Sequence, residues 1–141
     1  MDDEKFRDAI LSLPVRFGDF DSHAYFFVNE AVTHTVKSLA RERNEKGARH
    51  VSARELIEGS LDFAVREYGF LAPEVFSYWG LTSGSDLGVI VYRMIDAGIL
   101  SAGENDRRED FDGPDDLPAR LSALLARRPA PPEPTPLPPI A

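Results

Sequence analysis

The chain of 141 residues contains no cysteine. That absence excludes a disulfide framework, thiol catalysis, iron–sulfur clusters and zinc sites built on thiolates. No window approaches the roughly 18 unbroken apolar residues of a membrane span, and the first residues are acidic where a signal peptide would be basic. We therefore expect a soluble cytoplasmic protein that does not enter a membrane.

Positive charge is also scarce. The chain has 16 Lys and Arg residues against 24 Asp and Glu residues, which gives a net charge of −8. Nucleic acids and anionic lipids are repelled by such a balance, so nucleic acid is disfavoured as a partner. The length is typical of a single domain with one hydrophobic core.

The sequence motifs of common enzymes are missing as well. The chain has no phosphate-binding glycine motif, no GxSxG and no HExxH. Its three histidines are His23, His34 and His50. Glu30 and His34 lie four residues apart on one helix face, but such a pair supplies two metal ligands at most. The sequence therefore predicts no catalytic residue, no metal site and no cofactor.

What the chain does contain is helical periodicity. Apolar residues recur at steps of three and four in six segments, and no segment shows a convincing alternation of apolar and polar residues. The expected helices cover residues 3–13, 23–43, 53–68, 73–79, 85–97 and 117–128. This pattern predicts a mainly α, compact, single-domain protein over residues 1–128, followed by a tail.

Capping residues mark several of the expected helix ends. Ser52 and Glu55 have the spacing of a capping box before the third helix, and Gly69 is placed to close that helix in the left-handed conformation. Pro14 is expected to end the first helix. Ser22 is expected to cap the second.

Residues 52–112 resemble a winged helix-turn-helix in the order of their elements, with 73–79 as positioning helix and 85–97 as recognition helix. Residues 99–112 would form the wing, a short hairpin, although their β-propensity is poor. Recognition helices carry basic or amide side chains to base edges, whereas 85–97 offers only Arg93. Such a fold can instead bind proteins, so Arg93 is a candidate partner-binding residue. A plain helical bundle is the alternative architecture.

Aromatic residues are densest around the fourth helix. Phe70, Phe76, Tyr78 and Trp79 fall within ten residues of one another. Their helical spacing favours a place in the core, and an exposed recognition patch is the alternative.

Acidic residues are concentrated in residues 104–116, which hold seven acids and two arginines. The spacing of the acids lacks the glycine and the closing glutamate of a calcium-binding loop. The segment is therefore interpreted as a solvated loop, a docking surface for a basic partner, or a divalent-ion site. Glu109, Asp110 and Asp112 are the candidate partner-binding residues in it.

The last thirteen residues, 129–141, hold seven prolines and one charge. Proline lacks the amide donor of helices and sheets, so a disordered, proline-rich tail sampling polyproline II is expected. The alternative is a ligand for an aromatic groove on a partner, with Pro132, Pro136 and Pro139 as candidate contact residues.

From Ala24 to about Leu117 the chain resembles a family of small uncharacterised proteins found mainly in planctomycetes and verrucomicrobia. The runs that carry the resemblance are AYFFVNEAVTHTV, HVSARELIEG, FLAPEVFSYWGL, SDLGVIVYRMIDAGILS and DRREDFDGPDDL. The resemblance implies a single compact domain and carries no assigned activity.

These observations predict a non-catalytic, cytoplasmic interaction or adaptor protein. Its partner would be a protein with a basic surface or an aromatic groove. The alternative is a winged-helix DNA-binding transcriptional regulator, which rests on the order of the helices alone.

Deletion of residues 129–141 is expected to leave the stability of the domain unchanged, because the tail has few apolar anchors and the last expected helix precedes it. Thermal melts of the full and truncated chains would measure this. A large fall in melting temperature on truncation would mean that Leu137 or Ile140 packs on the domain.

Overall fold

The computed structural model describes residues 3–43 and 50–127, and these form six α-helices and two short 3₁₀ helices with no strand. The helices are α1 (Asp3–Phe17), α2 (Ser22–Arg43), α3 (Ala53–Tyr68), η1 (Gly69–Leu71), α4 (Ala72–Trp79), α5 (Gly84–Asp96), η2 (Arg108–Phe111) and α6 (Leu117–Ala126). The predicted mainly α fold is confirmed. The proline-rich segment 129–141 lies outside the described residues.

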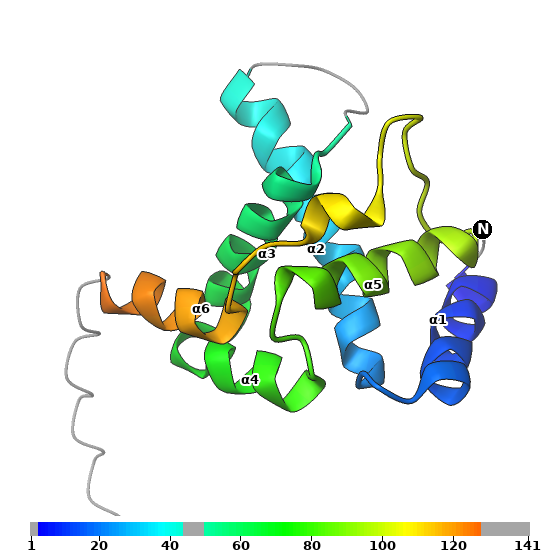
Figure 1. The fold of residues 1–141 in the computed structure, drawn as a ribbon, viewed down its shortest axis with the longest axis horizontal. Coiled ribbons are helices and arrows are strands. Elements are labelled where there is room, and N and C mark those ends of the chain that lie inside the picture. The colour runs from blue at the N-terminus through cyan, green and yellow to red at the C-terminus, as the bar shows by residue number, and fades with distance from the viewer. Residues whose placement is uncertain (1–2, 44–49, 128–141) are drawn as a thin grey trace, which may run out of the picture.

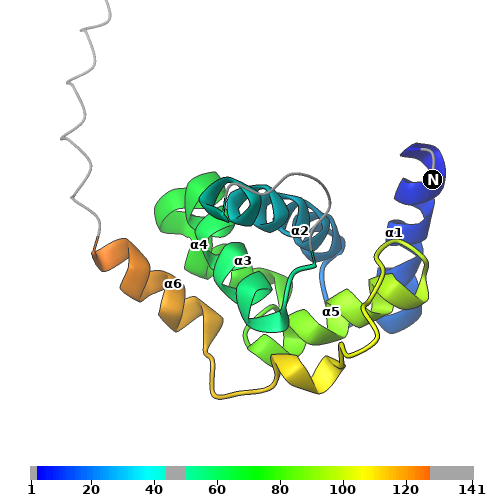
Figure 2. The ribbon, with the colours of Figure 1, turned by 90° about the horizontal axis from the view of Figure 1, so that it is seen from above.

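The helices pack around one core. Figure 1 shows α2, α3 and α5 at the centre, with α1 at one end of the molecule and α6 with α4 at the other, and Figure 2 shows the same order from above. Every helix except the short η1 contributes buried apolar side chains to a single cluster. The largest fully buried members are Tyr25, Phe76, Ile10, Ile57, Leu61, Leu81, Leu87, Ile90, Met94, Leu117 and Leu121.

Several helix starts follow the sequence prediction. Ser52 accepts a hydrogen bond from the Glu55 amide at 3.1 Å while the Glu55 carboxylate accepts one from the Ser52 amide, so the capping box is formed. Ser83 and Asp86 form a second box before α5, and Asp116 accepts from the Ala119 amide at the start of α6. Each arrangement satisfies amides that a helix start leaves without partners.

Glycines close the helices much as expected. Gly98 has φ of 76° and the Ile99 amide donates to the Met94 carbonyl at 2.8 Å, which is the Schellman pattern. Gly69 also has a positive φ, 54°, but its ψ of −131° differs from the left-handed helical value that the sequence suggested.

Two predicted helix boundaries are wrong. Pro14 lies inside α1, which continues to Phe17. The helix buries Ile10 and Leu13 in the core, and the Gly18 amide donates to the Pro14 carbonyl at 2.9 Å, which completes the last turn. Ser22 is the first residue of α2 and does not cap it. Asp21 does so, accepting from the His23 amide at 2.9 Å, since a carboxylate suits the positive end of a helix dipole.

The predicted hairpin at residues 99–112 does not form. The segment is an irregular loop followed by η2, and the part of the chain that is described contains no strand. The physical reason is the burial of Phe111 against α5, where a Cβ added at Gly88 would lie 2.8 Å from the Phe111 Cβ. A side chain held this close to a helix fixes the segment as a covering loop, and the wing predicted at residues 99–112 is absent.

Helices α2 and α3 approach each other closely at Gly59. A Cβ added at Gly59 would lie 1.9 Å from the Thr35 Oγ1 and 2.8 Å from its Cγ2, so only glycine fits there. Thr35 is itself buried, and its hydroxyl donates to the Ala31 carbonyl at 2.7 Å, which holds the side chain in place. Glycine inside a helix is unfavourable by about 1 kcal/mol relative to alanine. This packing offsets that disadvantage.

Gly59→Ala should destabilise the domain by about 1–3 kcal/mol, the usual range for overpacking, although alanine is the better helix former. Urea unfolding of the variant would measure the change. Thr35→Ala removes the clashing hydroxyl and methyl groups, so in the double variant the loss should be smaller than the sum of the single losses. Additive losses would contradict a direct contact.

Candidate functional site

The side chain of Arg93, a candidate partner-binding residue, is hydrogen-bonded to other residues of the fold. Its Nη1 donates to the Asp19 Oδ1 at 2.7 Å and its Nη2 to the Asp19 Oδ2 at 2.9 Å, and Nη1 also donates to the Tyr25 hydroxyl at 3.0 Å. The guanidinium lies 3.8 Å from the centroid of the Phe17 ring. The Arg93 side chain is 18% exposed, and it connects α5 to the link between α1 and α2.

The charges of this contact alter the acidity of both groups. The hydrogen bonds from Arg93 are the largest influence on Asp19 and hold the pKa of its carboxyl below the usual 3.8. In turn the Asp19 carboxylate raises the pKa of Arg93. A paired, stacked guanidinium of this kind stabilises the fold and has few donors left for a partner.

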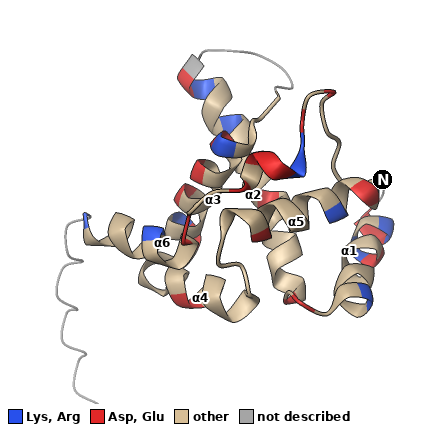
Figure 3. Cartoon of the chain, in the orientation of Figure 1, with Lys and Arg blue, Asp and Glu red and all other residues tan. Residues whose placement is uncertain are grey.

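The three acidic candidates lie on the segment that covers the start of α5, where Figure 3 shows acidic residues gathered on η2. Asp112 accepts from the Ser85 hydroxyl at 2.7 Å, and Asp110 accepts from the Arg107 amide at 3.1 Å. Glu109 is exposed. Two of the three carboxylates therefore hold the segment in place, and Glu109 faces solvent.

Other acids of the segment are also used internally. Asp106 pairs with His50 at 2.7 Å. Asp115 pairs with Arg54 at 2.8 Å and contacts Arg120 at 3.4 Å. These bonds hold residues 104–116 in place, and most of the segment is exposed to water, as its interpretation as a solvated acidic loop requires.

Each histidine pairs with one aspartate. His23 contacts Asp21 at 2.7 Å, His34 contacts Asp62 at 2.9 Å, and His50 contacts Asp106. Over the residues that the structure describes, no group of three or more His, Cys, Asp or Glu side chains is arranged to hold a metal ion.

The aromatic group of the sequence divides into a buried and an exposed half. Phe76 and Trp79 are buried, and the Phe27 ring contacts both at ring-centroid distances of 5.2 Å and 5.4 Å. Phe70 and Tyr78 are exposed. The predicted place in the core is thus confirmed for Phe76 and Trp79 and is wrong for Phe70 and Tyr78. The tail candidates Pro132, Pro136 and Pro139 lie outside the described residues.

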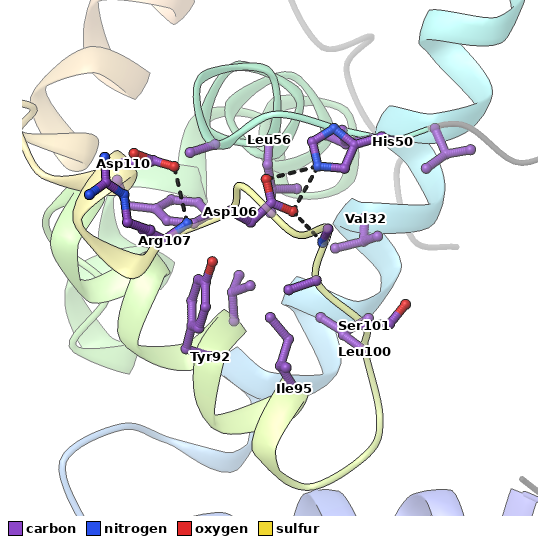
Figure 4. Close-up of a pocket in the computed structure, with 17 residues that line it drawn as sticks. Val32, His50, Leu56, Tyr92, Ile95, Leu100, Ser101, Asp106, Arg107 and Asp110 are labelled. Carbon is purple, nitrogen blue, oxygen red and sulfur yellow. Dashed lines mark hydrogen bonds and ion pairs between the residues drawn. The ribbon is translucent and has the colours of Figure 1, made fainter.

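A cavity of about 430 Å³ opens between α2, the start of α3, α5 and the loop of residues 100–107. Figure 4 shows Tyr92, Ile95 and Leu100 around its opening, with Asp106 and His50 on one side. Binding sites for small ligands have volumes of about 300–1,000 Å³ and a mainly apolar lining with a few polar groups. This cavity could not be predicted from the sequence, because its walls come from four separate segments of the chain.

The polar groups that line the cavity shift the pKa values of Asp106 and Tyr92. Burial is the largest influence on Asp106 and opposes its ionisation, but the hydrogen bonds from His50 and the Gly103 amide prevail and lower the pKa of the carboxyl. Burial raises the pKa of the Tyr92 hydroxyl, and the charges of Asp106, Asp110 and Glu109 raise it further. A negative potential therefore exists at this end of the cavity.

Comparison with known proteins leaves the chain without a relative to draw on. No family model matches it, and no curated protein or solved structure matches it either. Across the described helices, none is long and apolar enough to cross a bilayer. The site must therefore be interpreted from its own chemistry.

Asp19→Asn should destabilise the domain by about 0.5–1 kcal/mol at pH 7, because the bidentate pair is partly exposed to water. The folded-state pKa of Asp19 lies below 3.8, so its contribution is present above that pH and is lost as the pH falls through the folded pKa. The free energies of unfolding of the variant and the natural chain, measured as a function of pH, should become equal in acid. Asp96→Asn, an exposed change on α5, the helix that carries Arg93, is the control. A difference in unfolding free energy that stays constant at all pH values would contradict the assignment.

Proposed function

We propose that this chain is a non-catalytic protein-interaction domain of the cytoplasm, and that its contact surface is the exposed apolar corner formed by η1 and α4. The observation that carries the proposal is the exposure of three large apolar side chains there. Phe70 is 59% exposed, Leu71 61% and Tyr78 81%. We call these three residues the apolar corner.

The geometry of the apolar corner suits a contact surface. Leu71 is the N-cap residue of α4, and Tyr78 follows it by seven residues, about two helical turns, which places both on the same side of that helix. Exposed apolar groups that are close together are a common mark of protein contacts. The adjacent Phe76 and Trp79 are buried, and such a rigid base reduces the conformational entropy that binding would cost.

Charge favours a particular kind of partner. Glu67 and Glu74 are exposed beside the apolar corner, and the whole chain carries a net charge of −8. The complementary surface is an apolar groove bordered by Lys or Arg. The acidic segment 104–116 contributes to this through its field, which accelerates encounter with a basic partner more than it strengthens the complex.

The alternative function is a DNA-binding regulator. Helix α5 would be the recognition helix, but its single basic residue, Arg93, is bound to Asp19 and Tyr25. Specific DNA binding also requires cationic contacts to phosphate, and affinity falls steeply with salt. A salt-dependent mobility shift by the natural chain would favour this alternative over the proposal.

A photoreactive amino acid at position 78 tests the proposal in the cells that make the protein, with the same amino acid at position 15 as control. Val15 is 89% exposed on α1, so it matches Tyr78 in exposure and apolar character. A protein captured at position 78 and not at 15 would then be purified for a binding measurement with the unlabelled chain.

In that measurement the combined variant Leu71→Ser and Tyr78→Ser should bind the captured protein at least about tenfold more weakly, because central aromatic contacts often contribute 1.4 kcal/mol or more. Val15→Ser should leave the affinity unchanged, and both variants should melt like the natural chain. Unchanged affinity in the double variant would refute the apolar corner as the contact surface.

A further inference from the structure

We propose that the cavity between α2, α5 and the loop of residues 100–107 is a binding site for a small hydrophobic amine, whose apolar group enters the cavity and whose ammonium stays at the acidic rim. This inference does not depend on the proposed protein contact, which lies on η1 and α4. It rests on the cavity's volume, its apolar walls and the sign of the charges around it.

The walls of the cavity are apolar. Val32 and Val36 come from α2, Leu56 from α3, and Val91 and Ile95 from α5. Leu56 and Val91 are buried. Side chains of this kind stabilise an apolar group removed from water by roughly 25 cal/mol per Å². The cavity of about 430 Å³ accommodates a compact aliphatic or aromatic group.

The rim carries hydrogen-bonding groups with negative charge. The carboxylates of Asp106 and Asp110 belong to the lining, and the Tyr92 hydroxyl is directed toward the loop that bears them (Figure 4). Burial is the main cause of the raised pKa of the Tyr92 hydroxyl, and the charges of Asp106, Asp110 and Glu109 add to it. An ammonium at this place gains attraction to two carboxylates and can donate to the hydroxyl oxygen.

Two basic groups also line the cavity, and neither reverses the charge at the rim. His50 is paired with Asp106 through Nε2 at 2.7 Å. In Figure 4 the Arg107 side chain lies on the same side of the cavity as Asp110. Two carboxylates against one guanidinium give the lining a negative balance while His50 is neutral, so an amine is favoured over an acid.

The loop is held over the cavity by the groups that give the rim its charge. Asp106 accepts from both His50 Nε2 and the Gly103 amide, the latter at 2.7 Å. These bonds join residues 50, 103 and 106, which lie on two segments distant in the sequence. The rim is thus preorganised, which lowers the entropy that binding would cost.

Three probes of equal length test the proposal: hexylamine, 1-hexanol and hexanoate, titrated into the full chain at pH 8 and followed by amide and methyl NMR. Imidazole side chains are usually neutral and alkylamines charged at this pH. Hexylamine should bind at least about tenfold more tightly than hexanol, and hexanoate more weakly than both. Shifts should concentrate on Val32, Val91, Tyr92 and Ile95.

Variants assign the binding to this cavity. Asp110→Asn should reduce the preference for the amine over the alcohol several-fold, whereas Asp96→Asn, at the end of α5 and outside the lining, should leave it unchanged. Ile95→Trp should block all three probes. A thermal melt checks that each variant is folded, and Tyr92→Phe, which removes only the hydroxyl, replaces Asp110→Asn if that variant unfolds.

Nα-acetyl-lysine amide distinguishes two sources of the same chemistry. Binding as tight as that of hexylamine would indicate a lysine side chain of another protein, and weaker binding a free small amine. Equal affinity for hexylamine and hexanol, a preference for hexanoate, shifts away from the cavity, or no binding by any probe would each overturn the proposal.

Discussion

The contact of α2 with α3 at Gly59 and Thr35 is the constraint on which the rest of the structure depends. No side chain fits between the two helices there, so their separation is fixed at one point by backbone against a buried threonine. On α3, Leu56 lies on one side of Gly59 and lines the cavity together with Val32 of α2. Phe63 lies on the other side of Gly59, where its ring contacts that of Phe27 at a centroid distance of 5.4 Å.

Many aspartate side chains of the chain are bonded to groups within the fold. Aspartates cap α2, η2, α5 and α6, pair with all three histidines and hold Arg93 and Arg54. Each of these bonds satisfies a backbone or side-chain donor, and each keeps its negative charge near the surface. The same groups therefore stabilise the fold and set the sign of its electrostatic potential.

The features predicted correctly from the sequence are those that depend only on residues close together in the chain. Ser52 and Glu55 are three residues apart, and their bonds need no other part of the chain. The hairpin failed because Phe111 is fixed by a glycine of α5, a contact that local propensity does not contain. Arg93 was a candidate partner-binding residue because nothing in the sequence indicates its pairing with Asp19, which lies 74 positions away.

The site was predictable only in part for the same reason. Helical spacing placed Phe70, Phe76, Tyr78 and Trp79 in one group, but Phe76 and Trp79 are buried against Phe27 of α2, a contact that the spacing does not contain. The residues that line the cavity are up to 79 positions apart, between Val32 and Phe111. Only the assembled fold brings them together.

The attachment of α1 has a consequence for the order in which the domain opens. α1 contributes only Ile10 and Leu13 as fully enclosed side chains, and most of its other residues face water. Its far end is fastened through Asp19 and Phe17, both held by Arg93. Such an element is expected to detach as a cooperative unit with a smaller free energy than global unfolding. The amide protons of α1 would then exchange with solvent before those of α3, and Arg93 would set the interval between the two events.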